Sequence, residues 1–221
     1  SEKSKKYPGC TSTPASSSRR STSDSSPSIA GTRTTADQPP SGVNTVSAGC
    51  VVANDCNRST FRRAYLHVIR AARNLVRIEN AYFIPDRGVR RALIRAASRG
   101  VDVQIIVPGR SDVKVIEWAS LYVLRHLARM GIKIWRWRGV MMHAKTATVD
   151  AVWSTIGSYN FDSQSRFNNL EVTVEILDPA VGKTLVNGFD RDVTNCDPYD
   201  EAAWRALPWW KKSLAWIAYR L

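Results

Sequence analysis

The sequence reads His143-Ala144-Lys145-Thr146-Ala147-Thr148-Val149-Asp150 and, after six further residues, Gly157-Ser158-Tyr159-Asn160. The first stretch alternates like a β-strand, and Asp150-Ala151 is typical of a turn into a second strand over residues 152–156. Because side chains two residues apart share one face of a strand, His143 and Lys145 point the same way. The hairpin therefore brings an imidazole and an ammonium group beside the Gly157 segment, where glycine lets the backbone approach an anion closely.

These residue types suit the cleavage of a phosphodiester. A neutral imidazole nitrogen of His143 can attack phosphorus and form a covalent phosphohistidine. Lys145 and Asn160 would stabilise charge on the non-bridging oxygens, at about 3 kcal/mol for one such donor. A third strand over residues 170–176 could bring Glu171 beside His143, where its carboxylate would accept the other imidazole N–H and fix the tautomer. No metal ion or other cofactor is implied.

The motif HxKxxxxD followed by GSxN resembles the signature of the phospholipase D superfamily. The segments at residues 80–85, 99–103 and 169–171 are similar to the C-terminal half of bacterial cardiolipin synthases, and the likeness covers residues 58–221. The resemblance implies a catalytic set: His143, Lys145, Asp150, Asn160 and Glu171. It also implies a phosphate-binding set: Lys145, Gly157, Ser158 and Asn160. Asp150 has the opposite strand parity to His143, so a structural role in the turn remains an alternative for it.

The superfamily builds its site from two facing motifs, in which one histidine attacks phosphorus and the other protonates the leaving alcohol. This chain has one such motif, because neither His67 nor His126 is followed by lysine two residues later. Two interpretations remain open. The chain is one half of a two-motif enzyme and needs a partner half, or two copies share a site as a homodimer.

Composition divides the chain into three parts. Residues 1–57 are rich in Ser, Thr and Pro and poor in large apolar side chains, so we expect a disordered tail. Residues 58–200 are expected to form the phospholipase D-like domain, and residues 201–221 an aromatic and basic C-terminal segment. No apolar run has the length of a signal peptide or a membrane span. The cysteine positions form neither a zinc pattern nor a disulfide framework, which favours a reduced, cytoplasmic protein.

The fold class expected for the central part is α/β, with a mixed β-sheet sandwiched by helices. Strand and helix patterns alternate there at the spacing of βαβ units. Besides the hairpin, strands are predicted at residues 76–83, 101–107, 132–137 and 170–176. Helices are predicted at residues 59–75, 88–98, 113–130 and 179–195. Tyr82-Phe83 and Trp135-Arg136-Trp137 are interpreted as core and strand residues.

The charge and the C-terminus point to an anionic partner. The net charge is +13, of which residues 1–50 contribute only +3, so the folded part is basic. This favours a phospholipid surface or a nucleic acid without separating them. Beyond Pro208 a short amphipathic helix would carry one apolar side: Trp210, Leu214, Ile217 and Leu221. Tryptophan with lysine suits the lipid headgroup boundary, and packing on its own domain is the alternative.

The resemblance implies phosphatidyl transfer between phospholipids through a phosphohistidine. Two phosphatidylglycerol molecules would give cardiolipin, on the cytoplasmic side of a bacterial inner membrane to which the protein binds peripherally. With water as the acceptor, the same site would be a phospholipase D. A dimeric phosphodiesterase acting on DNA is the main alternative, because small single-motif members of the superfamily are dimeric nucleases. A non-catalytic protein that binds anionic surfaces is the third.

Overall fold

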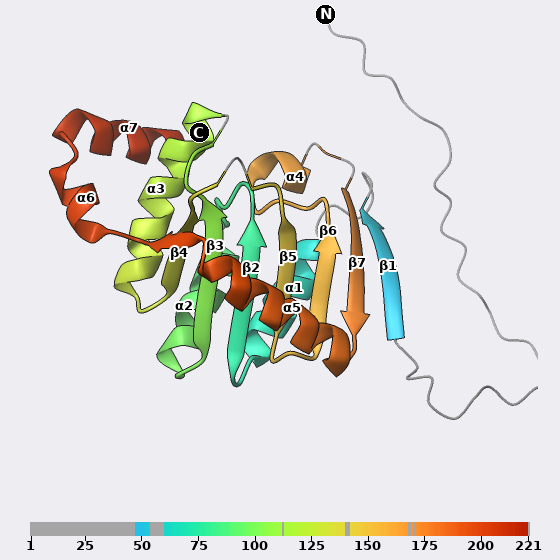
Figure 1. Cartoon of the computed structure of the whole chain (residues 1–221). Helices are drawn as coiled ribbons and strands as arrows, with labels where there is room; N and C mark the ends of the chain where they lie inside the picture. Colours follow the sequence, from blue (N-terminus) through green and yellow to red (C-terminus); the bar gives the residue numbers. More distant parts are fainter. Residues whose placement is uncertain are drawn as a thin grey trace, which may run out of the picture. The chain divides into compact units, whose positions relative to one another are not determined.

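A computed structural model describes residues 47–53, 60–111, 113–139, 142–167, 169 and 171–220. The chain divides into two units, Ser1–Val43 and Asn44–Leu221, and every described residue belongs to the second. These residues form an eight-stranded sheet in the order β1-β7-β6-β5-β2-β3-β4-β8, with helices on both faces (Figure 1). The predicted fold class, a mixed α/β sheet between helices, is confirmed.

Three parallel strands form one half of the sheet: β2 (Leu75–Asn80), β3 (Asp102–Pro108) and β4 (Lys133–Trp137). Helices α2 (Arg87–Ser98) and α3 (Lys114–Arg129) connect them. Asp86 caps α2, because its carboxylate accepts hydrogen bonds from the backbone N–H groups of Gly88 and Val89. The helix ends before Gly100, whose φ of 90° suits glycine. This half is the βαβ alternation that the sequence predicts.

The other strands are antiparallel to their neighbours. They are β5 (Lys145–Val149), β6 (Trp153–Gly157), β7 (Glu171–Leu177) and β1 (Ser47–Ala53) on one side, and the short β8 (Cys196–Pro198) at the other edge. Strand β5 lies against β2, so the predicted hairpin of β5 and β6 joins the two halves. The hairpin and the strand that follows it are confirmed, except that the first strand begins at Lys145 and His143 precedes it.

The sequence prediction is wrong for Ser47–Ala53, which it placed in a disordered tail. These residues form β1 and pair with β7 over its whole length, from Ser47 opposite Leu177 to Ala53 opposite Glu171. Composition alone misses such a strand because its stability comes from backbone pairing along an otherwise open sheet edge. The rest of the predicted tail lies outside the described residues.

Helices cover the two faces of the sheet. Figure 1 shows α5 (Pro179–Val193) crossing one face, while α1 (Thr60–Ala71) and α2 lie on the other. The larger hydrophobic core lies under α1, α2 and α3, and includes Ile69, Leu93 and Leu127, which are fully buried. A smaller core under α5 contains Ile106 and Phe189. Each fully buried side chain of this size contributes about 1.5–3 kcal/mol.

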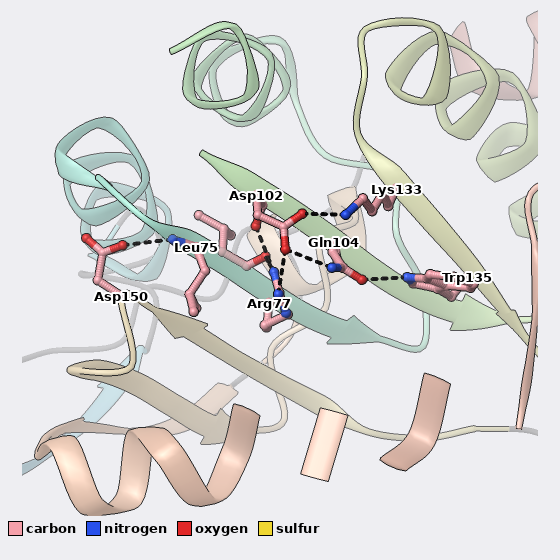
Figure 2. Close-up of polar contacts among 8 residues, drawn as sticks. Leu75, Arg77, Asp102, Gln104, Lys133, Trp135 and Asp150 are labelled. Atoms are coloured by element: carbon pink, nitrogen blue, oxygen red, sulfur yellow. Dashed lines mark hydrogen bonds and ion pairs between the residues drawn. The ribbon is translucent and has the colours of Figure 1, made fainter. Parts of the chain in front are cut away.

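A polar network ties the parallel strands together beneath α5 (Figure 2). Asp102 accepts hydrogen bonds from Arg77 at 2.6 Å, Gln104 at 2.8 Å and Lys133 at 3.0 Å. The Trp135 indole donates to Gln104 Oε1 at 2.9 Å. Burial alone would raise the pKa of Asp102, but these donors hold it at about 2. The network therefore carries a carboxylate that stays charged at neutral pH.

Three further helices complete the described residues: α4 (Ser163–Phe167), α6 (Glu201–Ala206) and α7 (Trp209–Arg220). Helix α7 is the predicted helix beyond Pro208. One side of it packs on α3, where Ala215 is buried and the rings of Tyr219 and Tyr122 lie 5.2 Å apart. Its other side leaves Trp210 and Ile217 exposed. The segment thus both packs on its own domain and presents apolar side chains to solvent.

Candidate active site

The motif residues other than Asp150 gather at one end of the sheet, where β2 and β6 end and β5 and β7 begin. Figure 1 shows these four strands side by side. An open cavity of about 720 Å³ lies there. It is lined by His143, Lys145, Gly157, Ser158, Asn160, Asn169 and Glu171. The structure thus brings together every residue of the predicted site except Asp150.

His143 and Lys145 are in direct contact. Lys145 is the first residue of β5 and only 8% exposed, and its Nζ lies 2.9 Å from both Nδ1 and the backbone oxygen of His143. Burial lowers the pKa of Lys145, while the nearby Glu171 and Asp162 carboxylates oppose that effect. When the lysine is charged it must donate to Nδ1, so a neutral imidazole then carries its proton on Nε2.

Glu171 has different partners from the predicted one. Its carboxylate accepts hydrogen bonds from Ser158 Oγ and, at 3.3 Å, from Asn169 Nδ2. The prediction gave Glu171 the imidazole N–H of His143, but within the described part of the chain Nδ1 faces Lys145 instead. The reason is local: β6 places Ser158 directly beside β7, where the Val172 backbone N–H also donates to Ser158 Oγ at 3.0 Å.

Asn160 is held in place by its neighbours. It is buried, and its backbone N–H donates to Ser165 Oγ at 3.2 Å. Asn80 at the end of β2 clamps the residues on both sides of it, donating to the Tyr159 oxygen and accepting from the Phe161 N–H, each at 3.2 Å. Among the described residues, Asn160 Oδ1 is buried without a hydrogen-bond partner. The Asn160 side chain can offer a ligand an acceptor in Oδ1 and donors in Nδ2, and a phosphate oxygen would need the donors.

Gly157 is required by packing as well as by any ligand. A Cβ at this position would lie 2.4 Å from the Val172 oxygen and 2.6 Å from Thr173 Cα. Both contacts are to the backbone of β7, which cannot move aside. Glycine therefore lets β6 and β7 converge at the cavity, a reason that the sequence pattern does not reveal.

Asp150 lies at the opposite end of β5, about 17 Å along the strand from Lys145. Its carboxylate accepts hydrogen bonds from the backbone N–H groups of Arg73, Asn74 and Leu75 at 2.7–3.0 Å, the last of which Figure 2 shows. Asp150 is outside the lining of the cavity. Its contacts match the structural alternative rather than the catalytic role.

Three residues near the site were missed or misinterpreted. Asn169 lines the cavity and holds Glu171, and Asn80 positions the motif segment. Tyr82 was interpreted as core, but its ring lies edge-on to the His143 imidazole at 6.4 Å, whereas Phe83 is buried as expected. Only Asn169 had a sequence signal, its position two residues before Glu171.

Two further features concern metals and membranes. Among the residues that the structure describes, no group of three or more His, Cys, Asp or Glu side chains could hold a metal ion. The free thiol of Cys196 is buried, and burial raises its pKa to about 11. Of the helices described, none is both long and apolar enough to cross a bilayer.

The fold and the cavity define a phospholipase D-like domain, and comparison with known proteins specifies the family. A family model described as cardiolipin synthase, PLD-like domain, matches residues 65–193. The chain therefore belongs to this family of phospholipase D-like domains.

Two curated relatives are bacterial cardiolipin synthases. Cardiolipin synthase B of Salmonella typhi is 31% identical over 167 residues, which are 75% of this chain and 40% of the relative. Cardiolipin synthase A of Cronobacter sakazakii is 30% identical over 177 residues, 80% of this chain and 36% of the relative. The chain thus spans about two fifths of the length of the curated relatives it matches.

Solved structures show the same fold. The phospholipase D family member Nuc from Salmonella typhimurium superposes with a TM-score of 0.61 at 23% identity, covering 71% of this chain and all of that one. The phosphatidylserine synthase of Haemophilus influenzae Rd KW20 superposes with a TM-score of 0.60 at 15% identity, covering 80% and 46%. At these identities the likeness concerns the fold alone.

Proposed function

We propose that the chain catalyses phosphatidyl transfer between anionic phospholipids, with His143 forming the covalent intermediate. The observation that supports this most directly is the lining of one open cavity by His143, the buried Lys145 and Asn160. The family supports the lipid class, because its curated relatives are named cardiolipin synthases.

The reaction has two displacements at phosphorus. In the first, Nε2 of His143 attacks the phosphorus of phosphatidylglycerol, an N–P bond forms, and the P–O bond to the glycerol headgroup breaks. The departing glycerol oxygen takes a proton from an acid on the opposite side of phosphorus. In the second, a hydroxyl oxygen of another phosphatidylglycerol attacks, the N–P bond breaks, and the hydroxyl proton returns to the same group. The products are cardiolipin and glycerol.

The contact between Lys145 and His143 has a role in this scheme. In the structure Lys145 Nζ lies 2.9 Å from Nδ1 of His143. While a charged lysine donates to Nδ1, a neutral ring holds its proton on Nε2, and that atom is then unable to attack. A bound phosphate competes for the ammonium group because its oxygens carry negative charge. Once Lys145 turns to the phosphate, the ring can hold its proton on Nδ1 and attack through Nε2. The Asn160 amide then donates to a second phosphate oxygen.

The acid for the leaving group comes from a second motif. Attack and protonation occur on opposite sides of phosphorus, and this sequence holds one HxK motif. A second copy of the chain, or a separate partner half, would supply the other histidine. The test combines solution mass with lipid turnover. We expect the active form to be an assembly that contains at least two HxK motifs. Lipid turnover at an ordinary enzyme rate by a demonstrable monomer would contradict the need for a second motif.

A DNA phosphodiesterase is the rival, and the basic charge of +13 favours any polyanion as substrate. The decisive comparison incubates the protein with supercoiled plasmid and with phosphatidylglycerol vesicles, each beside His143→Ala. Lipid turnover that requires His143 is expected. Plasmid nicking that requires His143, without lipid turnover, would overturn the proposal. Vesicle binding with no turnover of either substrate would favour the non-catalytic alternative.

We also propose that the protein binds peripherally to the cytoplasmic side of a bacterial inner membrane. The exposed side of α7 supports this, since Trp210, Leu214 and Ile217 lie three and four residues apart and all are at least 36% exposed. Lys211 lies over the Trp210 ring at 5.3 Å. Tryptophan beside lysine suits the headgroup region of an anionic bilayer.

A further inference from the structure

A second cavity, of about 610 Å³, lies between α2, α3, α7 and the segment that follows the motif. Phe161, Asp162 and Ser163 form its wall on the motif side. It shares no lining residue with the first cavity. The two are neighbours in sequence, because Asn160 lines the first cavity and the residues on either side, Tyr159 and Phe161, line the second. The two cavities therefore flank one short segment, and neither the motif nor the mechanism above uses the second. We call it the α2–α7 cavity.

Basic groups on α2 and α3 dominate its polar lining. Arg87 is exposed and makes no hydrogen bond or ion pair with any other residue that the structure describes. Arg90 is half-buried and lies 5.1 Å over the ring of Tyr219, to whose hydroxyl it also donates. Of the two acidic residues in the lining, Asp86 is neutralised by Arg62 at 2.5 Å and Asp162 accepts the Ser165 N–H at 2.7 Å. A hydrogen bond does not cancel the charge of Asp162, so Arg87 and Arg90 stand opposite one carboxylate in the lining that is unpaired among the residues described.

His126 on α3 lies close enough to two arginines for their charges to affect its pKa. Burial lowers the pKa of the His126 imidazole, and the charges of Arg90 and Arg129 lower it further. Of these two arginines only Arg90 lines the cavity, and an anion bound beside it would oppose its effect on His126.

The remaining walls are apolar or aromatic. The tilted rings of Tyr122 and Tyr219 lie beside the basic groups, and Trp216 is both part of the lining and 46% exposed. Trp216 lies on α7, the helix that also exposes Trp210 and Ile217. A free phosphate ion would leave these walls against water, whereas an amphiphile with an anionic head would cover them.

We propose that the α2–α7 cavity is a second phospholipid site, which binds the phosphate of an anionic glycerophospholipid at Arg87 and Arg90 and its apolar part against Tyr122 and Trp216. The inference deepens the proposed function, because a lipid held next to the motif segment is placed to act as the phosphatidyl acceptor. Its binding is nevertheless measurable without any turnover.

The experiment uses the full chain as His143→Ala, in which only His67 and His126 remain among the three histidines. Dihexanoyl phosphatidylglycerol is titrated in, and the histidine ring signals are followed by NMR over pH. The lipid is expected to shift the His126 signal and raise its pKa, while His67, which lies on α1 outside this cavity, stays unchanged. Dihexanoyl phosphatidylcholine, which has no net charge, should leave His126 where it is.

Two matched variants locate the binding site. Arg87→Ala should weaken phosphatidylglycerol binding about tenfold. Arg91→Ala, also exposed and on the same helix but outside the lining, should change it less than about twofold. Equal losses in both variants, or a His126 signal that ignores the lipid, would overturn the proposal. So would a response to inorganic phosphate as large as that to the lipid, which would indicate a simple anion site.

Failure of this inference is distinct from failure of the proposed function. Binding at His126 together with absent turnover in the unmutated chain would reject the transferase and keep the lipid site. If turnover depends on His143 but is unchanged in Arg87→Ala, and the His126 signal does not respond to lipid, the transferase is kept and the lipid site is rejected.

Discussion

Asn80 shows how a single residue can organise the site without lining it. Its side-chain amide bonds the backbone on both sides of Asn160, so it fixes where the Asn160 amide points. Asn80→Ala should cost about 2 kcal/mol in unfolding free energy, for two lost hydrogen bonds in a buried position. It should also lower kcat, because Asn160 would no longer be positioned.

A second variant separates the effect of Asn80 on the position of Asn160 from its effect on the stability of the fold. Asn80→Asp keeps the acceptor for the Phe161 N–H but loses the donor to the Tyr159 oxygen, and Asn74→Ala, which removes an exposed amide, is the control. Denaturant unfolding and kcat at saturating lipid are measured for each. Full kcat in a folded Asn80→Asp protein would show that Asn80 acts on stability alone.

Glu79 is a buried carboxyl group whose protonation couples stability to pH. It accepts a hydrogen bond from Thr146 at 3.1 Å, but burial first and the nearby Asp192 second raise its pKa to about 7. The folded protein therefore retains a proton that the unfolded chain releases near pH 4.5. Stability from this proton is complete below pH 4.5 and is lost as the pH rises through 7.

Replacing Glu79 removes this dependence. Glu79→Gln changes the free energy of unfolding at every pH. That change should be about 3 kcal/mol more favourable to the folded protein at pH 8 than at pH 4. Urea unfolding at the two pH values measures the difference. Asp190→Asn, at an exposed position on α5, is the control and should leave the profile unchanged. An unaltered pH profile in Glu79→Gln would contradict the assignment.

At the scale of elements, the turn between β5 and β6 shows what Asp150 contributes to the hairpin. Asp150 and Ala151 have φ angles of 52° and 53°, a left-handed conformation that costs non-glycine residues about 1 kcal/mol each. Three backbone hydrogen bonds from residues 73–75 compensate for this at Asp150.

Asp150→Ala should therefore destabilise the fold by about 2–3 kcal/mol, while the protein that remains folded keeps its kcat. Ala151→Gly, which relieves the strain, should stabilise it by about 0.5–1 kcal/mol. Thermal unfolding and turnover below the transition measure both. Loss of kcat in a folded Asp150→Ala protein would restore the catalytic role for this residue.

Helix α7 carries the prediction about membranes. Trp210→Ala combined with Ile217→Ala should weaken binding to phosphatidylglycerol vesicles at least about tenfold, because both side chains would leave water for the bilayer boundary. Raising the salt concentration should weaken binding further through Lys211 and Lys212. The control pair, Ile156→Ala with Val172→Ala, removes equally exposed apolar groups from the sheet. Equal losses for the two pairs would deny α7 a specific role.

The elements that could be predicted from the sequence are those set by local periodicity. The period of two predicted that His143 and Lys145 lie together, as they do, although β5 begins only at Lys145. For Gly157 the sequence predicted close approach to an anion, and the convergence of β6 and β7 there became evident only in the structure. The pairing of Ser47–Ala53 with β7 depends instead on a contact far along the chain, which local composition does not encode. The partner of Glu171 likewise depends on how β6 and β7 are aligned, because that alignment puts Ser158 nearer than His143.

At the scale of the whole molecule, the residues that join the strands and the residues that line the cavity lie in different places on the sheet. Its α5 face holds the charged network of Arg77 and Asp102, which joins the strands, while the reactive groups lie at one end of the strands. A site at strand ends leaves α7 outside it, with Trp210 and Ile217 exposed to solvent. The same arrangement leaves the cavity open on one side, where a second motif would have to approach.

The central claim is that His143 forms a covalent bond to the lipid phosphorus. The most direct measurement mixes the protein with dihexanoyl phosphatidylglycerol, quenches under alkaline conditions that preserve an N–P bond, and maps the mass of the adduct by peptide. We predict a phosphatidyl adduct on the peptide that contains His143, absent from His143→Ala and present in Asp150→Ala. Turnover that persists in His143→Ala, or an adduct on another residue, would contradict the account.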